Sequence, residues 1–137
     1  MKIGCFTGGG PAPGLNAALF HLAYELGERH TLLGFLRGAD GLLKKDYRVL
    51  DYKRIPLGDG GTILGTSRTN LEGKDAQVSA AIKSIGLEGF VTIGGDDTAR
   101  NAAVIDKIVP CIHIPKTIDR DIWGTEETLG YHRLVRR

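Results

Sequence analysis

Short apolar runs, each followed by a glycine-rich or polar loop, are the feature that most constrains how this chain folds. The runs at 3–6, 90–93 and 111–114 lie next to glycine or proline, which is typical of buried strands in a parallel sheet. Apolar residues recur at helical spacing over 15–26 and 75–85, and both segments end just before a glycine. Strands that alternate with helices predict an α/β fold, a Rossmann-like parallel sheet with helices on both faces.

The remaining segments complete this pattern less clearly. A further strand is predicted at 31–36, and a helix of small residues that contains Ala99, Ala102 and Ala103 is predicted after the acidic pair Asp96 and Asp97. The segment 38–52 is predicted to be a connecting loop with a small strand at 48–50. Because no internal repeat or linker divides the sequence, residues 1–137 are expected to form a single domain.

Composition argues against several classes of protein. The net charge of +2, with arginines gathered at the last residues, leaves no basic surface for nucleic acid. No apolar segment reaches the roughly 18 residues of a membrane span, and an apolar run begins at once, so a cytoplasmic protein without a signal peptide is expected. Cys5 and Cys111 lie inside apolar runs and are predicted to be core residues in a reducing compartment. His113, in the same run as Cys111, is predicted to be a hydrogen-bonded core histidine.

Three polar loops follow predicted strands, at 7–16, 94–98 and 115–121. Ligands of parallel sheets bind beyond the carboxyl ends of the strands, so these loops are expected to converge. In the first loop, Gly9 and Gly10 can expose backbone N–H groups at the start of a helix, which suits an anion. From this loop alone, a tight turn explains the glycines equally well.

Charged residues in two other segments also suggest phosphate chemistry. Arg68 could clamp a phosphate with its forked guanidinium, or could be an ordinary exposed arginine. Asp96 and Asp97 follow two glycines, where a carboxylate can hold Mg²⁺ beside phosphates. Helix capping is the favoured interpretation of either aspartate taken singly.

The loop 115–121, PKTIDRD, carries the side chains best suited to catalysis. Asp119 and Asp121 point the same way in an extended loop, so one can take a proton from a substrate hydroxyl while the other assists. Lys116 offers a point charge for a phosphate and Thr117 offers a hydroxyl. A turn of solvated charges is the alternative interpretation.

Taken in order, the motifs GGGPAPGLN, GGTILGTSR, IGGDDT and PKTIDRDIWGT resemble those of the phosphofructokinase family. The resemblance runs from Ile3 to about Gly130 and corresponds to the first part of a longer family chain. It implies two Rossmann-like domains in the complete protein, with this chain as the donor-binding domain. It also implies Mg²⁺-dependent transfer of phosphate to fructose 6-phosphate, giving fructose 1,6-bisphosphate in glycolysis.

The resemblance implies a role for each matching residue. Asp96 would hold Mg²⁺, and Asp119 would be the catalytic base on the sugar 1-hydroxyl. The residues that would bind the donor phosphates are Gly9, Gly10, Arg68, Asp97 and Lys116. The residues that would contact fructose 6-phosphate are Thr117, Asp119 and Asp121, and Lys116 and Asp121 would also assist the transfer.

Asp97 and Lys116 indicate which donor is used. ATP enzymes of the family generally carry glycine at the position of Asp97, and many carry it at Lys116, so this pair resembles the pyrophosphate-dependent branch. A carboxylate at position 97 would crowd and repel the α-phosphate of ATP, while Lys116 would neutralise compact pyrophosphate. Pro11, where ATP enzymes usually carry aspartate, agrees with this choice. An ATP-dependent 6-phosphofructokinase and an inactive phosphate- or nucleotide-binding fragment remain alternatives.

The last seven residues depart from the family pattern. Residues 131–137 are basic, where the family continues into a long helix, so a truncation or a frame change is expected. The later arginines and histidine that grip the sugar phosphate are absent, and the acceptor site is therefore expected to be incomplete. A homo-oligomer is expected for the complete form.

Overall fold

One sheet carries all the strands of the part of the chain described by our computed structural model, residues 1–8, 15–56 and 62–115. Its strands run in the order β3-β2-β1-β4-β5. They are β1 (Lys2–Thr7), β2 (Thr31–Phe35), β3 (Tyr47–Val49), β4 (Gly89–Gly94) and β5 (Cys111–Pro115). The helices are α1 (Leu15–Leu26), α2 (Ala39–Lys44), η1 (Tyr52–Arg54), α3 (Asp75–Ile85) and α4 (Asp96–Asp106).

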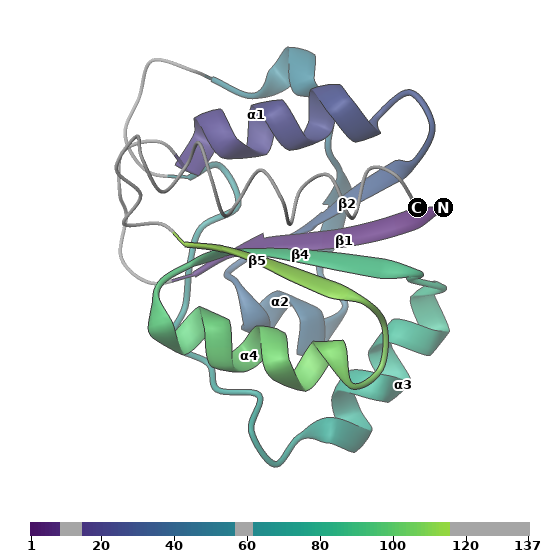
Figure 1. Cartoon of the computed structure of the whole chain (residues 1–137), viewed down its shortest axis with the longest axis vertical. Coiled ribbons are helices and arrows are strands. Elements are labelled where there is room, and N and C mark those ends of the chain that lie inside the picture. The colour runs from purple at the N-terminus through teal and green to yellow at the C-terminus, as the bar shows by residue number, and fades with distance from the viewer. Residues whose placement is uncertain (9–14, 57–61, 116–137) are drawn as a thin grey trace.

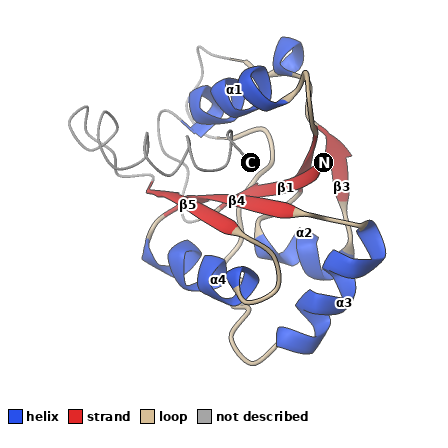
Figure 2. Ribbon diagram, turned by 45° about the vertical axis from the view of Figure 1, so that its right-hand side comes forward, coloured by secondary structure: helices blue, strands red, loops and turns tan. Residues whose placement is uncertain are grey.

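Helices cover both faces of the sheet, as the sequence predicts. Figure 1 shows α1 on one face and α2, α3 and α4 on the other, and the turned view of Figure 2 shows the same layers. Along β1, Cys5 packs in the cluster beneath α1, whereas Phe6 packs in the cluster beneath α2 to α4. Phe6 meets Phe90 of β4 edge to face, with ring centroids 5.3 Å apart. The period-2 alternation of the strands therefore builds two separate cores.

The structure of the segment 38–52 differs from the prediction, which was a connecting loop with one small strand. It contains α2, which begins one residue after Gly38, and its strand β3 pairs antiparallel with β2, so the sheet is not purely parallel. A parallel pairing needs a longer crossover than the connection 36–46 supplies, so the chain returns antiparallel. The helix escaped prediction because Gly41 lowers its intrinsic propensity and six residues are too few to show a period.

The parallel strands end together at one edge of the sheet. In the register, Thr7 at the end of β1 is the partner of Ile93, and Gly94 at the end of β4 is the partner of Pro115. The chain leaves β1 for a helix on one face and leaves β4 for a helix on the other, so the edge between β1 and β4 is a topological switch point. Ligands of open α/β sheets bind at such points.

Gly8 and Gly94 let this edge close tightly against α4. The Gly8 N–H donates to the Ile93 carbonyl at 2.8 Å. A Cβ at Gly8 would lie 2.0 Å from Thr98 Oγ1, and one at Gly94 would lie 2.4 Å from the same atom. The carboxyl ends of two strands and the first turn of α4 thus pack too closely for any side chain at these glycines.

Alanine at Gly8 and at Gly94 is expected to lower the free energy of unfolding by about 1–3 kcal/mol each, as overpacking does. The two variants should differ in how much stability a second substitution, Thr98→Ala, restores to each. Thr98→Ala removes the hydroxyl that Gly8→Ala meets, whereas a Cβ at Gly94 would still lie 2.8 Å from the Gly8 carbonyl oxygen. Urea unfolding of the single and double variants checks this, and equal rescue of both would contradict the packing described.

The two cysteines lie in or against the cores of the sheet. Cys5 is buried and Cys111 is half-buried, both are free thiols, and burial raises the pKa of each. Both thiols therefore stay protonated within the cores, and Cys5 is the core residue that was predicted.

Within the described ranges, no helix has the length and apolar character needed to cross a membrane.

Candidate functional site

The segment 62–71 crosses the switch-point edge without forming a helix or strand. Hydrogen bonds from separate elements hold it there. Thr7 Oγ1 at the end of β1 donates to the Gly65 carbonyl at 2.8 Å, and Asn16 Oδ1 of α1 accepts from the Ile63 N–H at 2.8 Å. These bonds fix the first half of the segment to the sheet edge, and the second half carries Arg68.

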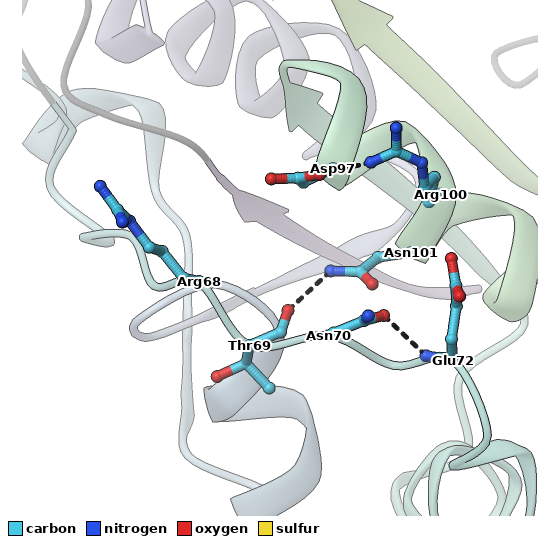
Figure 3. Close-up of a pocket in the computed structure, with 7 residues that line it drawn as sticks. All are labelled: Arg68, Thr69, Asn70, Glu72, Asp97, Arg100 and Asn101. Carbon is cyan, nitrogen blue, oxygen red and sulfur yellow. Dashed lines mark hydrogen bonds and ion pairs between the residues drawn. The ribbon is translucent and has the colours of Figure 1, made fainter.

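A pocket of about 340 Å³ opens between this segment and α4. Arg68 lies on one wall, and Asp97 and Arg100 lie on the other, facing each other in an ion pair (Figure 3). The residues that line it are Arg68, Thr69, Asn70, Glu72, Asp97, Arg100 and Asn101. Two guanidinium groups and two carboxylates share the walls, so their formal charges cancel. Of the predicted site residues, the structure thus brings Arg68 and Asp97 together.

Asp96 and Asp97 are not the cap of α4. The N-cap position belongs to Gly95, which makes no side-chain cap hydrogen bond. Both aspartates are exposed in the first turn, where the helix dipole favours a negative charge. The Asp97 side chain is 92% exposed and pairs with Arg100, three residues on. The favoured interpretation of either aspartate as a capping residue is therefore wrong, and both carboxylates face solvent at the site.

Asp96 was predicted to hold Mg²⁺, and its surroundings fit that ion. Among residues 1–8, 15–56 and 62–115, no three His, Cys, Asp or Glu side chains gather as a metal cluster. Mg²⁺ in phosphoryl-transfer sites is usually held by one or two carboxylates together with substrate phosphates and water. One exposed carboxylate beside the end of β4 meets that requirement, with the remaining ligands coming from the donor.

His113 lies beside the site on β5 and has a structural role, as predicted. Its Nδ1 lies 2.8 Å from Thr92 Oγ1 on the neighbouring strand. Burial lowers the pKa of His113, against the opposing effects of a hydrogen bond with the Gly94 backbone and the charge of Asp96. The half-buried imidazole is thereby biased toward its neutral form and bound to a neighbouring strand.

Six predicted site residues lie outside the described part of the chain: Gly9, Gly10, Lys116, Thr117, Asp119 and Asp121. The described residues next to them in the sequence, Gly8 and Pro115, lie at the carboxyl ends of the parallel strands. Gly8 contacts Thr98, and Pro115 is the register partner of Gly94. The roles of the six residues remain predictions.

Sequence reasoning missed Arg100, Glu72 and Asn101 as pocket residues. Arg100 had one available signal, its i,i+3 spacing from Asp97 on the helix that was predicted. Asn101 had the corresponding i,i+4 spacing from Asp97, but its partners lie 30 and 32 residues away and no local pattern indicates them.

Comparisons with known proteins agree with the fold. The family model described as phosphofructokinase matches residues 2–136. A pyrophosphate–fructose 6-phosphate 1-phosphotransferase of Dictyoglomus thermophilum is 40% identical over 98% of this chain and 41% of its own length. The enzyme of that name from Thermoproteus tenax is 38% identical over 98% of this chain and 42% of its own. ATP-dependent 6-phosphofructokinase 3 of Streptomyces coelicolor is also 38% identical, over 98% and 42%. The chain therefore spans about two fifths of the length of these curated relatives.

Solved structures give the same fold. Pichia pastoris phosphofructokinase in the T-state superposes with a TM-score of 0.74 at 24% identity, over 87% of this chain and 15% of that one. Phosphofructokinase from Saccharomyces cerevisiae superposes with a TM-score of 0.72 at 24% identity, over 96% of this chain and 22% of that one.

Proposed function

Since the chain belongs to the phosphofructokinase family, we propose that it carries the donor side of an enzyme that transfers phosphate from pyrophosphate to fructose 6-phosphate. The product is fructose 1,6-bisphosphate. One observation supports this most: Arg68 and Asp97 line a single pocket at the switch-point edge of the sheet, beside the exposed carboxylate of Asp96. A guanidinium and a helix N-terminus together favour a phosphate in that place.

Each residue has a proposed task in the reaction. Arg68 binds the donor phosphates, joined by the backbone of Gly9 and Gly10 and by Lys116. Asp96 holds Mg²⁺, which when bound neutralises phosphate charge. Asp119 takes the proton of the sugar 1-hydroxyl as general base. Thr117 and Asp121 hold the sugar, and Asp121 and Lys116 assist the transfer.

The choice of pyrophosphate rests on Asp97 and Lys116. Relatives named for pyrophosphate and relatives named for ATP are about equally identical to this chain, so overall identity does not favour either donor. Two like charges 4 Å apart repel by about 1 kcal/mol in water and about 4 kcal/mol near a protein surface. Arg100 offsets part of the Asp97 charge, so the repulsion is weaker than for an unpaired carboxylate, and the volume of the side chain is proposed to act against an ATP α-phosphate together with the remaining charge.

A phosphate-binding module without turnover is the second candidate, since the described residues of the pocket, Arg68 and Asp97, are proposed to bind only the donor. Calorimetric titration of the 137-residue chain with pyrophosphate and with ATP, each with MgCl₂, tests donor binding. An assay of fructose 1,6-bisphosphate formation by a full-length protein that carries these residues separates the candidates. In that protein the module predicts binding without product, whereas the enzyme predicts both.

We expect Arg68→Met to weaken pyrophosphate binding about 10- to 100-fold, because charge-assisted hydrogen bonds to phosphate are lost. Arg29→Met removes an exposed arginine in the turn after α1 and serves as the matched control. Pyrophosphate binding that both variants leave unchanged would contradict the proposed donor site.

We further place this reaction in the cytoplasm, in keeping with two free cysteines in the described chain and with phosphorylated sugars as substrates. The complete enzyme is proposed to be a homo-oligomer.

A further inference from the structure

We infer that Asn101 is a positioning residue of the donor site, acting through Arg68; this inference rests on the proposed function. Asn101 lies in the first half of α4 and is only 6% exposed. Its Nδ2 donates to the Thr69 carbonyl at 3.0 Å, and its Oδ1 accepts from the Leu71 N–H at 2.9 Å. One buried amide therefore bonds the backbone of the crossing segment at two points, as Figure 3 shows for Thr69.

These bonds join the two walls of the pocket. Thr69 directly follows Arg68, so the bond to its carbonyl fixes the Thr69–Asn70 peptide, one residue beyond the Cα that carries the Arg68 side chain. Asn101 lies four residues after Asp97, one helical turn along the same face of α4. The amide therefore sets the separation between Arg68 and the helix turn that carries Asp96 and Asp97.

That separation matters because charge-assisted hydrogen bonds depend steeply on distance and angle. In the proposed site, Arg68 on one wall holds a donor phosphate, and the start of α4 on the other wall faces it. Both contacts can form only if the distance between the two walls is fixed. The crossing segment has no helix or strand to fix it. The hydrogen bonds that join it to the sheet edge and to its neighbours, at Thr62, Ile63, Leu64 and Gly65, lie before Arg68. After Arg68, the buried side chain of Leu71 packs in the core, and Asn101 supplies the hydrogen bonds between the segment and α4.

An amide is the group that this place requires. Its two partners are a carbonyl, which needs a donor, and an N–H, which needs an acceptor. The amide supplies the two on separate atoms of one short side chain, so that it reaches both partners at once. Leucine has the same branched arrangement of heavy atoms and offers neither. Serine is small and leaves room for water to satisfy the two backbone groups.

The test is a double-mutant cycle on the 137-residue chain, with the dissociation constant of inorganic pyrophosphate in MgCl₂ measured by calorimetry. Asn101→Leu is expected to weaken binding about tenfold when Arg68 is present, because displacing a binding group by about 1 Å is costly. In the Arg68→Met background the same substitution should change binding less than about twofold, since its effect passes through Arg68. Asn101→Ser should give the same pattern if the leucine variant fails to fold.

Val104→Ala is the matched control for lost stability. Val104 is buried on the same helix, one turn beyond Asn101, and does not line the pocket. Its truncation should lower the unfolding midpoint in urea while pyrophosphate affinity stays within about twofold.

Two results would overturn the role of Asn101 and leave the proposed donor site standing. In the first, Asn101→Leu and Asn101→Ser bind pyrophosphate as tightly as the parent does, while Arg68→Met binds it more weakly. In the second, Asn101→Leu still weakens binding tenfold in the Arg68→Met background. If the parent fails to bind pyrophosphate, or if Arg68→Met binds it unchanged, the proposed donor site fails and the role of Asn101 fails with it.

Discussion

Replacement of Asp119 by asparagine is expected to lower kcat about 10²- to 10⁴-fold while leaving pyrophosphate affinity within about twofold. Asparagine keeps the shape of the side chain and removes its ability to take the proton of the sugar 1-hydroxyl. The measurement is the rate of fructose 1,6-bisphosphate formation by a full-length protein that carries these 137 residues.

Asp75→Asn is the matched control for this variant. Asp75 is an exposed aspartate in the first turn of α3, paired with Lys107 at 3.3 Å and remote in sequence from the proposed base. Its variant should turn over at the parental rate. A full-length Asp119→Asn protein whose kcat stays within a few-fold of the parent would show that Asp119 is not the base.

Replacement of Asp97 by glycine is expected to raise kcat/KM for ATP about 10- to 100-fold relative to pyrophosphate. The substitution removes both the volume and the charge that stand against an ATP α-phosphate. The cost in stability should be small, because the lost ion pair with Arg100 is exposed on both sides and such pairs contribute about 0–1 kcal/mol. Steady-state kinetics with each donor at saturating fructose 6-phosphate measures the shift.

Asp97→Asn separates charge from volume. The amide keeps the size of the carboxylate and removes its charge, so a shift close to that of glycine would assign the exclusion of ATP to repulsion. A shift seen with glycine alone would assign it to crowding. Asp75→Gly makes the same change in the first turn of α3 and should leave donor preference unchanged. Unchanged preference in Asp97→Gly as well would contradict the role of Asp97.

Much of the fold could be predicted because the apolar pattern is strong where the elements are buried. Apolar residues recur with the helical period in the helices and form short runs in the strands, and both patterns are visible in the sequence. The helix α3 is followed by Gly86 in the left-handed conformation, which makes glycine a reliable signal for the end of a helix. The antiparallel direction of β3 could not be predicted, because Tyr47–Val49 is a short exposed edge strand with no buried face to specify its pairing. Short α2 was hidden by its glycines.

Residue chemistry alone could predict the site only one residue at a time. Arg68 and Asp97 each had an ordinary explanation, and only the family resemblance joined them, since no local pattern shows that 62–71 and α4 share a pocket. The buried amide of Asn101 was missed because its partners, Thr69 and Leu71, are backbone groups that any residue provides. Tertiary hydrogen bonds of this kind leave no local pattern, whereas a glycine loop or an ion pair one turn apart does.

The most direct test of the donor proposal is the ratio of kcat/KM for pyrophosphate to kcat/KM for ATP in the unmodified full-length protein, with MgCl₂ and fructose 6-phosphate present. With Asp97 and Lys116 in place, pyrophosphate should be preferred by about 100-fold or more. A 100-fold preference corresponds to about 2.7 kcal/mol, which lies within the repulsion of about 1–4 kcal/mol expected between the Asp97 carboxylate and an ATP α-phosphate. Equal use of the two donors, or a preference for ATP, would contradict it.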